Sequence, residues 1–168
     1  MKAIVDNHQE MLVDTEFEQY RLKVKEDLLN RFHGKPESLN FLERIILSES
    51  DREVLFYIAE QLDLRAYTNS IIVTTCNCSY LDHVDFDNIR AIINFEPASQ
   101  GRKPGKVFRA VNTLLPDAGI FIGKTHVSYS VKACSKLIRN GFDIIDMSLI
   151  NGSLFFTALK TGEPQKRD

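Results

Sequence analysis

The sequence has few cysteines, no long apolar run and no excess of charge of one sign. Its three cysteines, Cys76, Cys78 and Cys134, are an odd number, and Cys76 and Cys78 are too close in sequence for an ordinary disulfide. We therefore expect reduced thiols in or near the core. The chain carries 21 lysine and arginine residues against 23 aspartate and glutamate residues, so no overall field attracts nucleic acid and we expect no nucleic-acid partner.

Segments that direct a chain into or across a membrane are also missing. No stretch approaches the roughly 18 apolar residues of a membrane-spanning helix, and residues 1–11 lack the charged start and apolar run of a secretion signal. This favours a cytoplasmic protein without a transmembrane segment, which reaches the inner face of the membrane only through a partner. The four histidines and three cysteines show no paired spacing typical of zinc ligands, so we expect no metal.

Length and composition limit the number of domains that the chain can form. A chain of 168 residues with 43% hydrophobic content is long enough for one domain with a real core. We expect a single α/β domain over residues 1–160, with a helical part over residues 1–65 and a sheet-containing part over residues 66–160. Residues 161–168 are charged and offer no core positions, which predicts a flexible tail.

Three helices are expected in the first part. Apolar residues recur at steps of three and four from Phe17 to Phe32, which is typical of a helix with one buried stripe. A second helix is expected around residues 38–47. Ser50 and Glu53 have the order of a capping box, so a third helix is expected to run to about Leu62. Aromatic residues on apolar stripes here and further along are expected in the core: Phe17, Phe41, Phe56 and Phe108.

The second part alternates strands with helices. Apolar runs at residues 71–73, 89–95 and 120–122 are separated by a crossover and by a helix at about residues 106–115, which indicates a mainly parallel sheet. A further helix is expected to begin at Ser128 and to end at Asn140, before Gly141. The dipeptide Asn151-Gly152 between two strand patterns predicts a C-terminal antiparallel hairpin. The expected fold class is therefore α/β with a Rossmann-type sheet.

The layout of residues 89–160 resembles the C-terminal half of class I methyltransferase domains. Its most specific piece is the turn Leu115-Pro116-Asp117-Ala118-Gly119 between a helix and an apolar strand. The resemblance implies a methyltransferase-like fold, in which an acidic, glycine-spaced loop after the first strand binds S-adenosylmethionine. Here Ile71-Ile72-Val73 leads into Thr74-Thr75-Cys76-Asn77-Cys78 without a glycine, although close backbone approach to a ligand needs one. Methyl transfer is therefore disfavoured, and we expect no cofactor.

A second resemblance spans residues 54–160. Several segments together resemble the region ahead of the catalytic part in bacterial sugar transferases, which move a sugar phosphate from a nucleotide sugar onto polyprenyl phosphate in surface polysaccharide synthesis. These segments are Gln61–Thr68, Ile71–Cys78, Phe86–Phe95, Leu115–Gly123 and Gly141–Asp146. The resemblance implies an accessory or regulatory domain with a membrane sugar transferase as its partner. The family's catalytic residues have no counterparts in this sequence, so no catalytic residue is assigned.

Ligands of open α/β sheets bind beyond the carboxyl ends of the parallel strands. Polar residues follow each expected strand, and a basic loop at residues 99–106 leads into a helix whose first amides suit a phosphate. The candidate binding residues are Thr75, Asn77, Asn94, Glu96, Arg102 and Lys106. Lys124 and His126 follow the third strand. The plainer interpretation is that these groups cap strand ends or form a solvated basic loop.

Three functional hypotheses follow. The first is a non-catalytic accessory or regulatory domain associated with a sugar transferase. The second is a transferase that binds S-adenosylmethionine or a nucleotide sugar, with Glu96 as the general base and the loop from Arg102 to Lys106 on phosphate. The third is an interaction module whose N-terminal helices dock onto a membrane transferase or onto a second copy of the chain.

Overall fold

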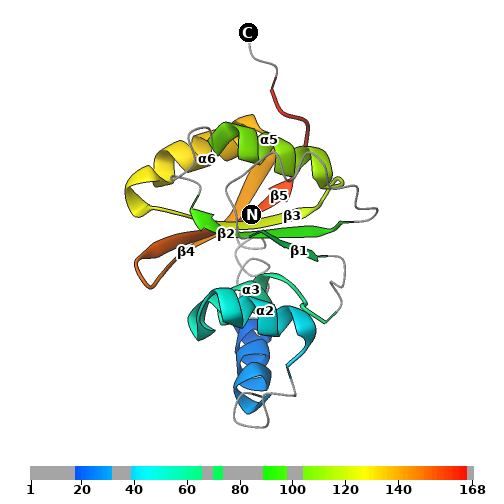
Figure 1. The fold of residues 1–168 in the computed structure, drawn as a ribbon, viewed down its shortest axis with the longest axis vertical. Coiled ribbons are helices and arrows are strands. Elements are labelled where there is room, and N and C mark those ends of the chain that lie inside the picture. Colours follow the sequence, from blue (N-terminus) through cyan, green and yellow to red (C-terminus); the bar gives the residue numbers. More distant parts are fainter. Residues whose placement is uncertain (1–17, 32–38, 66–69, 74–88, 98–103, 166–168) are drawn as a thin grey trace, which may run out of the picture. The chain divides into compact units, whose positions relative to one another are not determined.

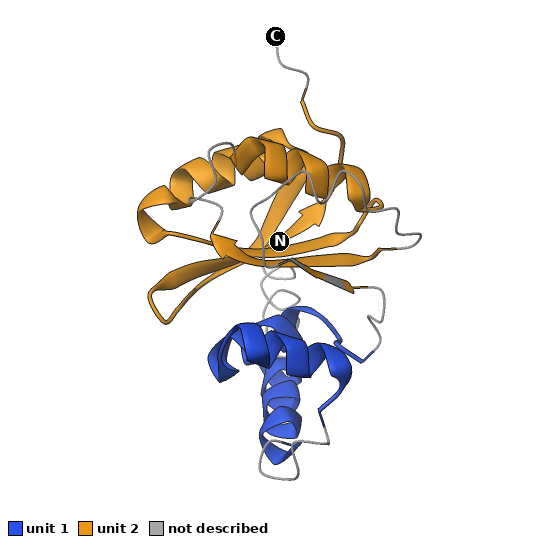
Figure 2. Cartoon of the chain, viewed as in Figure 1, with its two compact units in different colours: residues 1–65 blue, residues 66–168 orange. Residues whose placement is uncertain are grey.

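The computed structural model describes residues 18–31, 39–65, 70–73, 89–97 and 104–165 (Figure 1). The chain divides into two compact units, residues 1–65 and residues 66–168 (Figure 2). Within the described part of the chain, no helix combines the length and the apolar character needed to cross a membrane. The single domain over residues 1–160 stays a prediction.

The first unit is helical, as expected. It contains a helix over residues 18–31, α2 (Phe41–Glu49) and α3 (Arg52–Gln61). The capping box predicted at Ser50 is wrong by one residue, because the side chain of Asp51 accepts the Val54 N–H at 3.1 Å and caps α3. The Ser50 hydroxyl instead donates to the carbonyl of Ile46 in the preceding helix.

Helix α3 forms the centre of this unit, since its residues from Val54 to Ala59 are all buried. Phe56 is in the core as predicted, but Phe41 is 72% exposed, so its prediction was wrong. The buried positions of α2 are Glu43 and Ile46. Phe41 precedes Glu43 by two residues and therefore lies on the opposite face of the helix. Phe17 lies outside the described residues.

The second unit is built on a five-stranded sheet. The strands are β1 (Ser70–Val73), β2 (Ala91–Pro97), β3 (Ile120–Thr125), β4 (Phe142–Ile150) and β5 (Ser153–Lys160), in the order β1-β2-β3-β5-β4. The first three strands pair in parallel, and β5 is antiparallel to both β3 and β4. The α/β class with a Rossmann-type, mainly parallel sheet and a C-terminal antiparallel hairpin is thus confirmed. In the hairpin turn, Asn151 and Gly152 have φ of 47° and 78°, as an Asn-Gly turn of this type requires.

Two helices cover one face of the sheet, α5 (Pro104–Leu114) and α6 (Ser130–Arg139), and they lie side by side in Figure 1. A short 3₁₀ helix, η2 (Val127–Tyr129), precedes α6. The core beneath the helices is aromatic: the ring centroid of Phe121 lies 5.9 Å from Phe108, 5.7 Å from Phe142 and 5.3 Å from Phe156. These four side chains are almost completely buried.

Cys134 is a free, half-buried thiol on α6, 3.5 Å from the sulfur of Met147. This contact agrees with the expectation of a reduced thiol near the core. Cys76 and Cys78 lie outside the described residues.

A buried cation closes the C-terminal end of α5. The Nζ of Lys160 donates to the carbonyls of Asn112 and Leu115, each at 2.9 Å, and so satisfies acceptors that have no partner within the helix. The positive charge at this end also opposes the negative end of the helix dipole. Lys160 therefore anchors β5 to α5.

The residues after β5 are held by backbone contacts. The N–H groups of Thr161 and Gly162 both donate to the carbonyl of Gly141, and the N–H of Gln165 donates to that of Arg139. The side chain of Asn112 donates to the carbonyl of Gly162 at 2.8 Å. The flexible tail expected over residues 161–168 stays a prediction, but its first part has this defined path.

Candidate functional site

The predicted ligand edge of the sheet is described at two strands. Asn94 and Glu96 lie in β2, next to an irregularity in its pairing with β3. The buried Oδ1 of Asn94 accepts the N–H of Glu96 at 2.9 Å. The Asn94 side chain therefore caps the end of the strand, which is the plainer interpretation given in the sequence analysis. Thr75, Asn77 and Arg102 lie outside the described residues.

The third strand is longer than predicted, since β3 continues to Thr125. Lys124 pairs with Phe155 within the sheet and does not lie in a loop beyond the strand, which corrects its predicted place. His126 follows, and its Nδ1 lies 2.8 Å from the hydroxyl of Ser128 and accepts the Ser128 N–H at 3.4 Å. His126 is thus the N-cap of η2. The helix start predicted at Ser128 is wrong, because Ser128 lies within η2 and α6 begins at Ser130.

At this edge Glu96 is half-buried, and among the described residues the buried hydroxyl of Thr125 finds no hydrogen-bond partner. Lys106 is exposed in the first turn of α5, where the predicted phosphate site places it. Among the described residues, no group of three or more histidine, cysteine or acidic side chains is arranged to hold a metal ion. The phosphate site stays a prediction because residues 99–103, most of its basic loop, lie outside the described residues.

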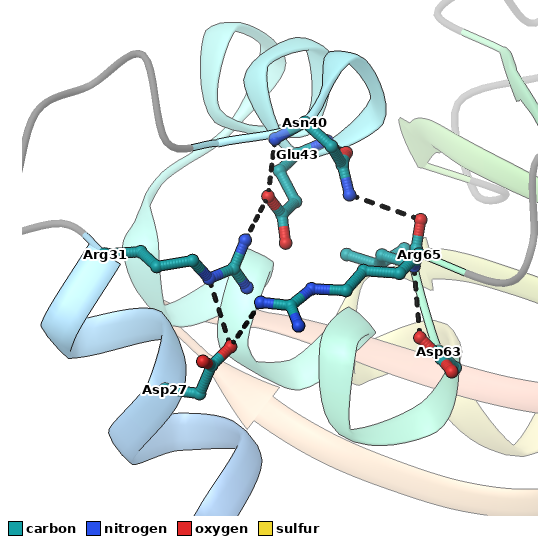
Figure 3. A network of polar contacts seen from close by, with 7 residues as sticks. Asp27, Arg31, Asn40, Glu43, Asp63 and Arg65 are labelled. Carbon is teal, nitrogen blue, oxygen red and sulfur yellow. Dashed lines mark hydrogen bonds and ion pairs between the residues drawn. The ribbon is translucent and has the colours of Figure 1, made fainter.

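A second polar site, which the sequence analysis did not identify, lies within the helical unit (Figure 3). Its centre is the carboxylate of Glu43, whose side chain is 2% exposed. One oxygen of Glu43 accepts from Arg31 at 2.7 Å and from the backbone N–H of Asn40 at 2.8 Å. In return, the Asn40 side chain accepts the Glu43 N–H at 2.9 Å, which completes a capping box at the start of α2.

The network continues toward solvent through Asp27. Its carboxylate accepts from Arg31 at 3.0 Å and from Arg65 at 2.9 Å, while the side chain of Asp63 accepts the Arg65 backbone N–H at 3.1 Å. The side chains of Asp27 and Arg65 are 50% and 60% exposed, so water screens their attraction. The buried pair of Arg31 and Glu43 is the part of the network whose loss is costly.

A pocket of about 330 Å³ opens beside this network. The helix of residues 18–31 supplies one wall, and the end of α3 with the segment after it supplies the other. The lining residues are Tyr20, Lys23, Val24, Asp27, Leu28, Arg31, Glu43, Ala59, Leu62, Asp63, Leu64 and Arg65.

One signal in the sequence points to part of this site. Asn40 and Glu43 stand three apart ahead of an apolar run, the same order that we assigned to Ser50 and Glu53. The partnership of Glu43 with Arg31 has no such signal, because the two residues are brought together by the packing of separate helices.

Replacing Glu43 with glutamine is expected to lower the free energy of unfolding by about 1–2 kcal/mol, because a neutral amide weakens two hydrogen bonds to a buried acceptor. Urea denaturation followed by circular dichroism measures the change. The matched control is Glu49→Gln, an exposed position on the same helix, with an expected change within about 0.5 kcal/mol. Equal losses in the two variants would contradict the role of the buried carboxylate.

No protein-family model matches the sequence, and no curated protein matches it significantly. Several solved structures that resemble the chain are methyltransferases. The magnesium protoporphyrin IX methyltransferase of Synechocystis, with bound SAM, has a TM-score of 0.41 and 12% identity over 48% of this chain and 43% of that chain. The precorrin-6y C5,15-methyltransferase of Geobacter metallireducens has a TM-score of 0.42 and 13% identity over 66% of this chain and 65% of that chain.

A third similar structure is the antibiotic-resistance methyltransferase Kmr, with a TM-score of 0.37 and 12% identity over 48% of this chain and 56% of that chain. The chain spans less than two thirds of the length of each of these three proteins. At these identities the likeness concerns the fold alone, and at these TM-scores it carries no argument about activity or cofactor. None of the three is a sugar transferase.

Proposed function

We propose that the chain is an accessory or regulatory domain on a methyltransferase-like scaffold, which does not transfer methyl groups and acts with a bacterial sugar transferase in surface polysaccharide synthesis. The observation that carries the proposal is that polar side chains at the carboxyl edge of the sheet form hydrogen bonds within their own chain. Asn94 and His126 are both bound to neighbouring groups of their own chain. A binding edge needs such groups free for a ligand.

The sequence after β1 supports the same proposal. No glycine occurs between Gly34 and Gly101, so the connection from β1 to β2 consists only of residues with side chains. A Cβ obstructs both the close approach of backbone to a ligand and a positive φ. The backbone contacts that the class I methyltransferase fold provides to an adenosyl donor at this position are therefore not expected from this sequence.

The link to sugar transferases rests on the sequence likeness of the segments from Gln61 to Asp146. In this proposal, a membrane transferase supplies the catalytic residues and this chain binds or regulates it at the inner face of the membrane. The alternative is that the chain binds a second copy of itself in place of the transferase. The proposal separates into two measurable statements, one about the methyl donor and one about the partner.

Calorimetric titration of the purified chain with S-adenosylmethionine is expected to give no binding at concentrations that saturate a catalytically active class I methyltransferase run as the control. Addition of the chain to a bacterial polyprenyl-phosphate sugar-phosphate transferase in membranes is expected to change the transfer rate several-fold. Micromolar affinity for the donor would overturn the non-catalytic role. The association with a sugar transferase would be overturned if the transfer rate does not change and the chain does not bind the transferase. This outcome would leave the result for the methyl donor intact.

A further inference from the structure

The two helices that cover the sheet have a basic outer face. Their buried residues face the sheet, so the exposed residues of α5 and α6 point together toward solvent (Figure 1). The two helices contain five basic residues and no aspartate or glutamate. The five, which we call the basic face, are Lys106, Arg109, Lys132, Lys136 and Arg139.

Four of these five cations are exposed to solvent. The exception is Lys136, which is half-buried and donates to the hydroxyl of Tyr129 at 2.8 Å. Lys106 and Arg109 lie one turn apart on α5, and the two exposed cations of α6 lie two turns apart, so each pair projects from one side of its helix. Within the described part of the chain, none of the four forms an ion pair. Their charge is therefore available to a partner.

Acidic residues near the two helices do not offset this charge. Asp117 and Asp143 lie past the C-terminal ends of the helices, in the turn before β3 and in β4. Glu163, in the segment after β5, is paired with Lys160 at 3.6 Å. The second unit as a whole has twelve basic against nine acidic residues, whereas the first has nine against 14. The overall balance of charge thus conceals a cationic surface, which attracts an anionic partner.

Exposed aliphatic side chains lie beside the cations on α6. Val131 is 81% exposed and Ile138 is 55% exposed, two turns apart on one side of the helix. Nucleic acids are bound through phosphate contacts and by stacking on aromatic rings, and α5 and α6 present no exposed aromatic ring. A bilayer combines anionic headgroups with hydrocarbon just beneath them. A lipid surface therefore fits both the cations and the aliphatic side chains.

We propose that the chain binds directly to the surface of an anionic bilayer through its basic face, with Lys106, Arg109, Lys132 and Arg139 on lipid phosphates and Val131 among the headgroups. This inference goes beyond the proposed function and does not rest on it, because it needs no transferase. Contact with lipid raises the concentration of the chain at the membrane, where its proposed partner lies.

The test is co-sedimentation of the full chain with phosphatidylcholine vesicles, with or without an equal part of phosphatidylglycerol. Binding is expected to the anionic vesicles alone, and about 1 M salt is expected to abolish it because the Debye length falls to about 3 Å. Each cation near an anionic leaflet strengthens binding about fivefold, so Lys132→Gln combined with Arg139→Gln is expected to weaken it about 25-fold. Val131→Ala is expected to weaken it about fivefold, since it removes apolar area that enters the headgroup region.

The matched control is Lys23→Gln combined with Arg44→Gln, which removes two exposed cations of the helical unit and makes the same change in net charge. Its binding is expected to equal that of the unaltered chain. All the replaced side chains are exposed, so the variants are expected to fold, and thermal melts verify this.

Equal sedimentation with neutral and anionic vesicles, or equal losses in the two double variants, would overturn the proposal. Binding of a short RNA duplex without binding to the anionic vesicles would also overturn it and would assign the basic face to nucleic acid. The vesicles contain no transferase, so none of these outcomes changes the result of the sugar-transfer assay.

Discussion

Replacing Phe121 with alanine is expected to lower the free energy of unfolding of the sheet-containing unit by about 3–5 kcal/mol. Phe121 is 0% exposed on the central strand β3, and its ring contacts those of Phe108, Phe142 and Phe156 with centroids 5.3–5.9 Å away. The truncation removes buried apolar area, leaves a cavity under both helices, and removes three aromatic pairs that are worth about 0.5–1.5 kcal/mol each. The large effect follows because all three losses fall on one side chain.

Urea denaturation followed by circular dichroism measures the effect. The matched control in the same unit is Val131→Ala on α6, where the side chain is 81% exposed and the expected change is within about 0.5 kcal/mol. A loss below about 1 kcal/mol for Phe121→Ala would show that the aromatic cluster does not form the core of this unit.

Replacing Gly141 with alanine is expected to lower the free energy of unfolding by about 3 kcal/mol or more, for two separate reasons. Gly141 has φ of 79°, which costs a residue with a Cβ about 1–2 kcal/mol. A Cβ at this position would also overlap the carbonyl of Gly162 and approach the amide nitrogen of Asn112 to 2.9 Å. The substitution therefore breaks the contact between Asn112 and Gly162 that holds the segment after β5.

Gly152→Ala separates the two causes. Gly152 has nearly the same φ, 78°, but a Cβ there meets nothing within 4 Å. Its substitution is expected to cost only the conformational term of about 1–2 kcal/mol. The difference between the free energies of unfolding of the two variants, obtained by chemical denaturation, measures the cost of the steric overlap at Gly141. If the two substitutions cost the same, the packing of Gly162 against Gly141 makes no contribution to stability.

The parts of the fold that sequence predicted well are those set by local chemistry. Asn151-Gly152 and Gly141 require positive φ, and the sequence shows this directly. The alternation of apolar runs with helices likewise indicated parallel strands. Local patterns do not give the position of a strand in the sheet, and the insertion of β5 between β3 and β4 is set by long-range pairing.

Errors in the first unit have a similar origin. Phe41 lies within an apolar run, but the register of α2 is set by its capping box and by Glu43, which places the aromatic ring outward. Ser50 and Asp51 are both good N-caps, and their sequence alone does not choose between them. The choice follows from where α3 packs.

The candidate sites differ in how far the local sequence indicates them. The place of Asn94 and Glu96 near the end of a strand could be predicted because the fold class puts polar residues there, and their binding of a ligand stays a prediction. The pocket around Lys23 was missed because it joins residues from Tyr20 to Arg65 through tertiary packing. Charged residues at helical spacing are usually solvated, and only the structure shows that the carboxylate of Glu43 is enclosed.

The interior place of β5 has a consequence for truncated chains. A chain that ends before Ser153 lacks the strand that pairs with both β3 and β4, so each of these strands is left with an open edge. Open edges of apolar strands are able to pair with other chains. Removal of the last strand is therefore expected to cause aggregation as well as a loss of stability.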